Sequence, residues 1–375
     1  MSSESKVVDL ISQVDAALEK AHLQSLDISF NELMGMKIEK ELVIDPDYQR
    51  LFQWSEGAQS RFIESLLLGM PVPPIYVIEI EEGKYSLIDG LQRISSYLHF
   101  RGALEAKHKG ISLGDELTLS DCDIVSALNG KKFKDLGTTL QIRLKRAFIR
   151  VEVVKKASDV RFKYHMFKRL NTGGEKLTDQ QIRNCTIRML DPQFNDYIAS
   201  LSADPSFASC VGIITDDQKD GWFDRELVLR FFAFKNQLGK FRHDVRDFLT
   251  DYMEAVSEPD PLKRLNFDYQ NEKADFEKTF QLFAKTLGEK AFGFPNKNRD
   301  AITKGFSAMH FEALTLGIQK HLKSIDLSNQ AEVSALATKL ADLKLNPEFV
   351  KLTSGGGKNS PGLLKARIKF VEDFL

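Results

Sequence analysis

The chain has 375 residues, of which 42% are hydrophobic and 28% are charged. This composition is ordinary for a globular protein and excludes disordered and collagen-like chains. Lys and Arg total 52 against 53 for Asp and Glu, which gives a net charge of -1. No overall field would therefore draw the chain to DNA or to a membrane, so any nucleic-acid contact must come from a local patch. The length suits two domains.

The N-terminus and the cysteines exclude further classes. The first residues lack the basic-then-apolar order of a secretory signal, and no apolar run approaches the ~20 residues that cross a bilayer. We therefore expect a cytoplasmic protein with no membrane partner. Cys122, Cys185 and Cys210 form no C-x-x-C pair, so neither a disulfide framework nor a cysteine zinc site is supported. We identify no set of metal ligands.

Hydrophobic periodicity divides the chain into three parts. Residues 1–24 carry apolar residues at helical spacing and are expected to form an amphipathic arm that packs on something else. Residues 25–190 mix strand and helix patterns, which predicts an α+β domain with a small mixed sheet and surrounding helices. Residues 191–375 show helical patterns almost throughout, which predicts an all-α domain.

The α+β part contains alternating strand and helix signals. A capping box at Ser29 to Glu32 begins a short helix, and Gly69 with the prolines after it ends another. The expected helices are 30–37, 55–69, 91–100, 158–170 and one from Thr178. The expected strands are 42–44, 75–80, 85–88 and 147–154, with a hairpin turn at 81–84 and a polar insertion from about 101 to 137. Helices of the all-α part include 226–236, 244–256, 274–287 and 300–322.

The strongest chemical signal is the strand that ends at Asp89. Gly90 follows, and a helix begins near Leu91, so free N–H groups and the positive end of a helix dipole meet at one point. Gln92 and Arg93 lie in the first turn, where they can grip phosphate oxygens. Asp89 could hold a metal or a sugar hydroxyl. The bland alternative is an ordinary turn with Asp89 as a cap.

Two other segments supply recognition residues. Tyr48, Gln49 and Arg50, with Trp54 after them, offer a second guanidinium and aromatic faces that could stack a base. Arg50 could instead pair with a carboxylate, and Trp54 could be core. Asn171 opens a glycine-containing loop that could bind a ligand or merely end a helix. Near the end of the chain, Lys358, Lys365, Arg367 and Lys369 suggest a basic patch.

These segments carry a family resemblance. They are Asp45-Pro46-Asp47-Tyr48-Gln49-Arg50 with Trp54, Pro73-Pro74-Ile75-Tyr76, Ile88-Asp89-Gly90-Leu91-Gln92-Arg93, and Phe167-Lys168-Arg169-Leu170-Asn171-Thr172-Gly173-Gly174. Together they resemble the N-terminal domain of GmrSD-type restriction endonucleases over about residues 25–190. That family is similar in fold to the ParB and sulfiredoxin group, whose glycine-x-x-arginine turn binds nucleotide phosphates.

The resemblance implies a nucleotide-binding module of a restriction or phage-defence system that associates with DNA. It implies catalytic roles for Asp89, Gln92 and Arg93, and nucleotide contacts from Tyr48, Gln49, Arg50, Gly90 and Asn171. A nucleoside triphosphate with Mg²⁺ is the implied cofactor. Leu91 stands where family members have Gln, which puts hydrolysis in more doubt than binding. It also removes the sulfiredoxin chemistry, which needs a cysteine there.

Family members often add a histidine-asparagine-histidine nuclease domain, and we find no closely spaced histidine pair for one. We therefore expect a stand-alone version, with a separate effector protein as a further partner. Two alternative functions remain open at this point. One is a ParB-like metal-dependent DNA nuclease, which needs a second carboxylate beside Asp89, and the other is a non-catalytic adaptor for a protein partner.

Overall fold

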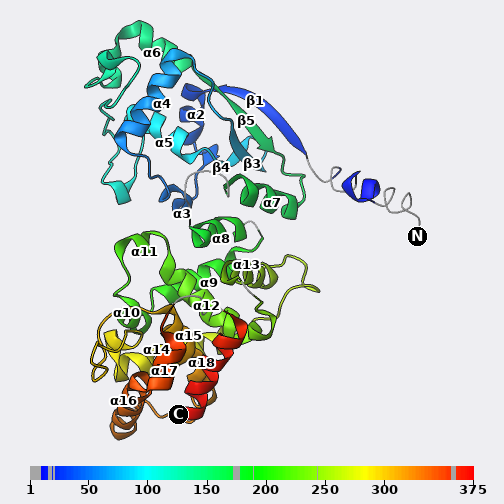
Figure 1. Cartoon of the computed structure of the whole chain (residues 1–375). Helices are drawn as coiled ribbons and strands as arrows, with labels where there is room; N and C mark the ends of the chain where they lie inside the picture. The colour runs from blue at the N-terminus through cyan, green and yellow to red at the C-terminus, as the bar shows by residue number, and fades with distance from the viewer. Residues whose placement is uncertain are drawn as a thin grey trace. The chain divides into compact units, whose positions relative to one another are not determined.

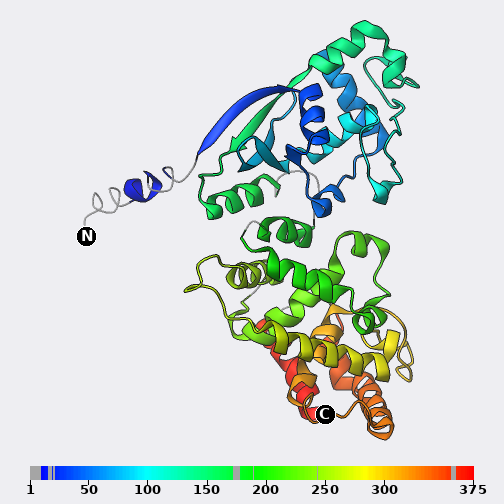
Figure 2. The same cartoon turned by 180° about the vertical axis from the view of Figure 1, so that it is seen from behind.

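The computed structural model describes residues 10–15, 19, 22–171, 178–188, 190–242, 244–355 and 360–375. The chain divides into two compact units, Met1–Glu175 and Lys176–Leu375, which are described separately below (Figures 1 and 2). The boundary that we predict at residue 190 lies inside the second unit.

The first unit is built on a five-stranded mixed sheet with the order β1-β5-β3-β4-β2. The strands are β1 (Leu23–Ser29), β2 (Leu42–Val43), β3 (Ile75–Glu81), β4 (Lys84–Asp89) and β5 (Phe148–Val154). β1 pairs with β5 and β3 pairs with β4 in antiparallel fashion, whereas β5 with β3 and β4 with β2 are parallel. The α+β class with a mixed sheet is therefore confirmed.

Helices surround this sheet. They are α2 (Phe30–Ile38), α3 (Pro46–Gln49), α4 (Glu56–Leu68), α5 (Leu91–Phe100), α6 (Gly137–Arg146) and α7 (Val160–Asn171). Leu33 and Met36 of α2 meet Val77 and Val151 of the sheet across a small apolar gap. Because side chains alternate along a strand, Phe148, Arg150 and the others in register with them point to the opposite face.

Helix α4 shows how local sequence sets an element. The Ser55 hydroxyl accepts the N–H of Ala58 at its start, and Gly69 at φ 68° ends it, where a side chain would be strained. Four apolar side chains on one face, Phe62, Ile63, Leu66 and Leu67, are buried. The predicted helix at 55–69 is thus confirmed.

Two elements escaped prediction. β1 reads Leu-Gln-Ser-Leu-Asp-Ile-Ser, a polar pattern that is extended because it pairs along its whole length with β5. The stretch that we interpret as an insertion ends at about residue 137, yet residues 133–136 form a 3-10 turn, and helix α6 follows where we predict no element. Tertiary pairing overrides weak local propensity in both places.

The polar stretch from 101 to 132 is fixed to α4 by buried side chains. The Glu64 carboxylate, 1% exposed, accepts the N–H groups of Ile124 and Val125 at 3.2 and 2.6 Å. Ser60 Oγ accepts the N–H of Ser120 at 3.0 Å. These bonds satisfy the backbone of a segment that has little regular structure.

The second unit is helical in all of its described regular elements. Its helices are α8 (Asp179–Ile187), α9 (Pro192–Ser202), α10 (Pro205–Val211), α11 (Asp216–Asp220), α12 (Phe223–Gln237), α13 (Val245–Val256), α14 (Tyr269–Thr286), α15 (Ala308–Gly317), α16 (Gln330–Leu345), α17 (Pro347–Thr353) and α18 (Pro361–Phe374). None of the helices in the described part of the chain is long and apolar enough to span a membrane.

Aromatic side chains fill the core of this unit. Phe231 of α12 meets Phe276 of α14 edge to face at 5.5 Å, and Phe232 stacks on the same ring at 5.7 Å. Beside them runs a chain of buried ion pairs, in which Arg230 bridges Glu226 at 2.9 Å and Glu312 at 2.7 Å.

Two predictions for the second unit need correction. Arg367 is 1% exposed and faces Glu312, so it does not belong to a C-terminal basic patch. The predicted helix at 300–322 is also shorter, because α15 begins only at Ala308, where Ser307 caps it.

A buried histidine and lysine lie together near α15 and α16. Lys344 is fully buried and donates to the carbonyl oxygens of Lys290, Ala291 and Gly293 at 3.1, 2.6 and 3.0 Å. Burial, reinforced by the Lys344 charge, lowers the pKa of His310 to about 3. His310 Nε2 lies 3.0 Å from the Thr353 hydroxyl.

This histidine makes the stability of the second unit depend on pH. The folded chain resists protonation of His310 down to about pH 3, whereas the unfolded chain takes up that proton near pH 6.5, so stability falls as pH falls below 6.5. We expect wild type to lose about 1 kcal/mol per pH unit through this group between pH 6.5 and 4.5. His310→Gln removes that component.

The measurement is urea unfolding followed by Trp222 fluorescence in a Trp54→Phe background, which confines the signal to the second unit. The stability advantage of wild type over His310→Gln should shrink steadily as pH falls. A constant difference across this range would contradict the assignment.

Candidate functional site

The turn between β4 and α5 has a backbone that only glycine fits. Gly90 has φ 103°, and a Cβ there would lie 2.3 Å from the Ile75 side chain. Gly90 also offers no side-chain cap, and no acidic residue lies in the first turn of α5. The N–H groups of the first turn therefore have neither an intrahelical acceptor nor a compensating carboxylate, which leaves a positive end that suits an anion.

Arg93 is held at this turn rather than free in solvent. Its Nη2 donates to Asp89 Oδ2 at 2.8 Å and to the carbonyl oxygen of Pro74 at 3.1 Å. The side chain is 15% exposed, and its buried Nε has no hydrogen-bond partner among the described residues. The guanidinium is thus fixed in place with donor capacity to spare.

Asp89 pairs with Arg93 in this structure, and the catalytic role that the resemblance implies for it stays a prediction. Its carboxylate is 31% exposed and pairs with Arg93, which orients the guanidinium. Among the described residues, no group of three or more His, Cys, Asp or Glu side chains could hold a metal ion.

Gln92 contacts the polypeptide rather than open space. Its Oε1 accepts the N–H groups of Gln53 and Trp54 at 3.0 and 3.1 Å, and its Nε2 donates to the carbonyl oxygen of Leu51 at 2.7 Å. We call this set of three bonds the Gln92 clip. It ties the segment after α3 to the first turn of α5, so Gln92 is a positioning residue.

Helix α3, which comes just before the segment held by the clip, carries two more of the predicted residues, Tyr48 and Gln49. The Tyr48 hydroxyl is buried and donates to the carbonyl oxygen of Ile88, one residue before Asp89. Gln49 Nε2 donates to the carbonyl oxygen of Glu105 at 2.6 Å. Both side chains therefore fix the segment and leave little donor capacity for a ligand.

Arg50 and Trp54 behave differently from each other. Arg50 is exposed, and its guanidinium has no hydrogen-bond or ion-pair partner among the described residues, which leaves it available for a ligand. Trp54 is half-buried and meets Phe62 edge to face at 5.7 Å. Asn171 ends α7, but its side chain and residues 172–174 lie outside the described part of the chain, so its role stays a prediction.

Two residues from the 101–132 stretch reach the same segment and were not predicted. Lys109 Nζ donates to the carbonyl oxygen of Trp54 at 2.7 Å and lies 5.0 Å from the Phe52 ring centre. His108 Nε2 lies 3.1 Å from the carbonyl oxygen of Phe52. Partial burial lowers the pKa of Lys109. No local sequence pattern could reveal contacts between residues so far apart in the chain.

The fold and the site together define an α+β domain that presents an uncapped helix N-terminus and a fixed arginine at the end of a sheet strand. Residues 30–188 match the model of the GmrSD restriction endonuclease N-terminal domain. The match is confined to these residues, and it indicates that the first part of the chain contains a domain of the kind found in restriction and defence systems. No curated protein and no solved structure matches the chain.

The family match confirms the resemblance drawn from the motifs. It does not bear on the expected lack of a nuclease domain or on the similarity to ParB and sulfiredoxin, which stay predictions. The motif residues from Asp45 to Arg93 all lie within the matched range.

The Gln92 clip gives a direct test of the site's construction. Gln92→Leu leaves three backbone groups without partners, so we expect the free energy of unfolding of the first unit to fall by about 2 kcal/mol. The N–H groups of Gln53 and Trp54 should exchange with solvent at least about tenfold faster.

The matched control is Gln49→Leu, which removes one hydrogen bond at the surface and should cost less than about 1 kcal/mol. Urea unfolding and amide hydrogen exchange measure both quantities. Equal effects of the two variants would show that the clip does not hold the segment.

Proposed function

We propose that the β4–α5 turn binds the phosphates of a nucleoside triphosphate, and that this binding serves a restriction module acting on DNA. The observation that carries the proposal is the uncapped N-terminus of α5, with Arg93 fixed beside it by Asp89 and Pro74. Fixed backbone N–H groups and a fixed guanidinium bind phosphate at a low cost in conformational entropy.

The two arginines would contact the phosphates in different ways. Arg93 is already in place and would donate to the phosphate through its Nη groups after a small rotation. Arg50 is exposed without a partner among the described residues, and it would order when an anion binds. The Gln92 clip keeps the segment that carries Arg50 against the turn that carries Arg93.

Mg²⁺ would enter with the phosphates. It favours one or two carboxylates and keeps several waters, so Asp89 fits as one oxygen donor in exchange for part of its contact with Arg93. The ion would neutralise phosphate charge. The residues of this chain bind and orient the phosphates, and hydrolysis belongs to the proposal only as a step to be tested.

The proposed association with DNA rests on the family match. The modules of that family belong to restriction endonucleases, whose function concerns DNA, and the net charge of -1 confines a DNA contact to a local surface. A separate effector protein that cuts DNA would complete the system.

Titration of wild type and variants with the four nucleoside triphosphates, with and without Mg²⁺, tests the phosphate site by calorimetry. We expect Arg93→Ala to weaken binding by about 10- to 100-fold, because a charge-assisted hydrogen bond contributes about 1.5–3 kcal/mol. Arg50→Ala should weaken binding less, and its thermal stability should equal that of wild type.

The control is Lys219→Ala, an exposed substitution in the second unit, which should bind like wild type. Arg93→Lys keeps the positive charge but loses the planar, two-pronged guanidinium, so its affinity for nucleotide should lie between those of wild type and Arg93→Ala. Unchanged binding in folded Arg93→Ala, or no binding of any nucleotide by wild type, would overturn the proposal.

A further inference from the structure

The first unit has an open groove on the other side of β3 from the β4–α5 turn. It measures about 1100 Å³ and lies among the end of α4, the 69–74 segment, α6 and the outer face of β5. Four large apolar side chains in it are exposed to solvent, at 42%, 41%, 43% and 67%. They are Leu68, Met70, Ile142 and Phe148, which we call the apolar groove.

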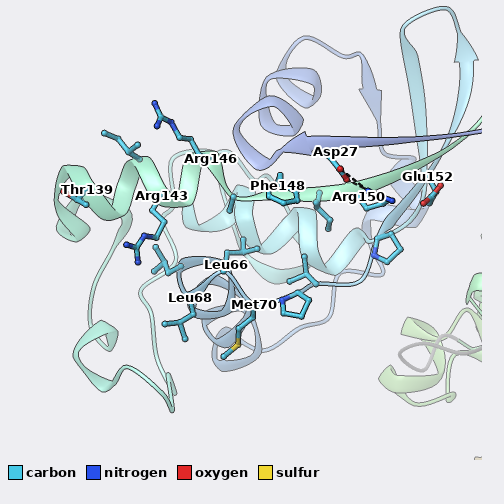
Figure 3. Close-up of a pocket in the computed structure, with 18 residues that line it drawn as sticks. Asp27, Leu66, Leu68, Met70, Thr139, Arg143, Arg146, Phe148, Arg150 and Glu152 are labelled. Atoms are coloured by element: carbon cyan, nitrogen blue, oxygen red, sulfur yellow. Dashed lines mark hydrogen bonds and ion pairs between the residues drawn. The ribbon is translucent and has the colours of Figure 1, made fainter.

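Basic side chains border this groove. Figure 3 shows Arg143 and Arg146 projecting from α6 at one end, and the Asp27–Arg150 pair at the other. Arg143 and Arg146 have no carboxylate partner within the described ranges. An exposed apolar hollow with unpaired cations at its rim suits an amphipathic helix that carries acidic residues.

The N-terminal segment of the same chain has that character. Residues 10–15 are helical, and Leu10, Ile11 and Val14 are 60%, 55% and 52% exposed. We call these three residues the apolar stripe. They lie on one face of a helix, since their spacing is i, i+1 and i+4. Asp9 and Asp15 flank the stripe in the sequence.

The length of the connection lets the stripe reach the groove. β1 runs from Leu23 to Ser29, which pairs with Phe148, and these six residue steps of strand span about 20 Å. The N–H of Glu19 donates to the carbonyl oxygen of Asp15. The eight steps from Asp15 to Leu23 span at most about 28 Å, which exceeds the length of β1.

We propose that the apolar stripe docks into the apolar groove of the same chain, with Asp15 facing the arginines of α6. The helix then lies antiparallel to β1 over the exposed face of β5. The tether favours this occupant over a separate partner, because a short linker holds the segment at millimolar effective concentration. Nucleic acid fits less well, since the floor between the rim arginines consists of four exposed apolar side chains.

The docked helix would cover the 69–74 segment that leads into β3. The carbonyl oxygen of Pro74 in this segment accepts from Arg93, so the groove and the β4–α5 turn share one stretch of backbone. The residues of the arm precede the family match, which begins at residue 30.

Disulfide trapping in the full-length chain tests the docking. The double variant Ile11→Cys with Ile142→Cys should form one intrachain disulfide per chain under mild oxidation. The product should run as a monomer of altered mobility on a non-reducing gel, and its mass should fall by about 2 Da because the S–S bond replaces two S–H bonds. Cys122 and Cys210 are buried and Cys185 is half-buried, so the single variants measure the background that these native thiols give.

The matched control is Ser12→Cys with Ile142→Cys, which moves the thiol off the apolar stripe and should be trapped at least tenfold more slowly. A second variant, Phe148→Asp, changes an exposed residue and should slow trapping of the Ile11 pair without unfolding the chain. Crosslinked dimers would show that a second copy fills the groove, and they would overturn the proposal. So would equal trapping of the Ile11→Cys and Ser12→Cys pairs, or no trapping of either pair.

Discussion

The site depends on the hydrogen bonds of one side chain, the amide of Gln92. Its oxygen and nitrogen together engage three backbone groups of residues 51–54. Because these groups belong to a segment without a regular hydrogen-bond ladder, the amide stands in for the missing partners. Tyr48 adds a second tie through the carbonyl oxygen of Ile88. The β4–α5 turn and the segment that bears Arg50 are therefore structurally coupled, and a substitution in either would disturb both.

Much of the first unit was predictable from local sequence. The hairpin of β3 and β4, helix α5 and the Asp89-Gly90 junction follow from alternation, helical periodicity and glycine chemistry. β1 and α6 were not predicted. β1 is rich in polar residues and is stabilised by its partner β5 and not by its own composition. The second unit follows the same division. The helices predicted at 226–236 and 244–256 follow from periodicity, whereas the burial of Arg367 depends on Glu312 in a distant helix.

The candidate site was predicted in place but not in detail. The motif pointed to the residues that gather at the turn, yet it could not show that Gln92 and Gln49 are engaged with backbone or that Lys109 joins them from the 101–132 stretch. Such partners are set by three-dimensional packing. In the function that we propose, the phosphate contacts therefore come from the backbone N–H groups of α5 and from Arg93, with Arg50 as the exposed second cation, and not from the amide side chains.

The central claim is that the N-terminus of α5 binds phosphate, and backbone NMR of the labelled full-length chain tests it most directly. Addition of a nucleoside triphosphate should shift the amide resonances of Gly90, Leu91 and Arg93 first and most, with smaller changes at Arg50 and none at Gly35 in α2. Saturable shifts confined to these amides are the result that the account predicts. Shifts that leave the β4–α5 turn unchanged while other amides respond would contradict it.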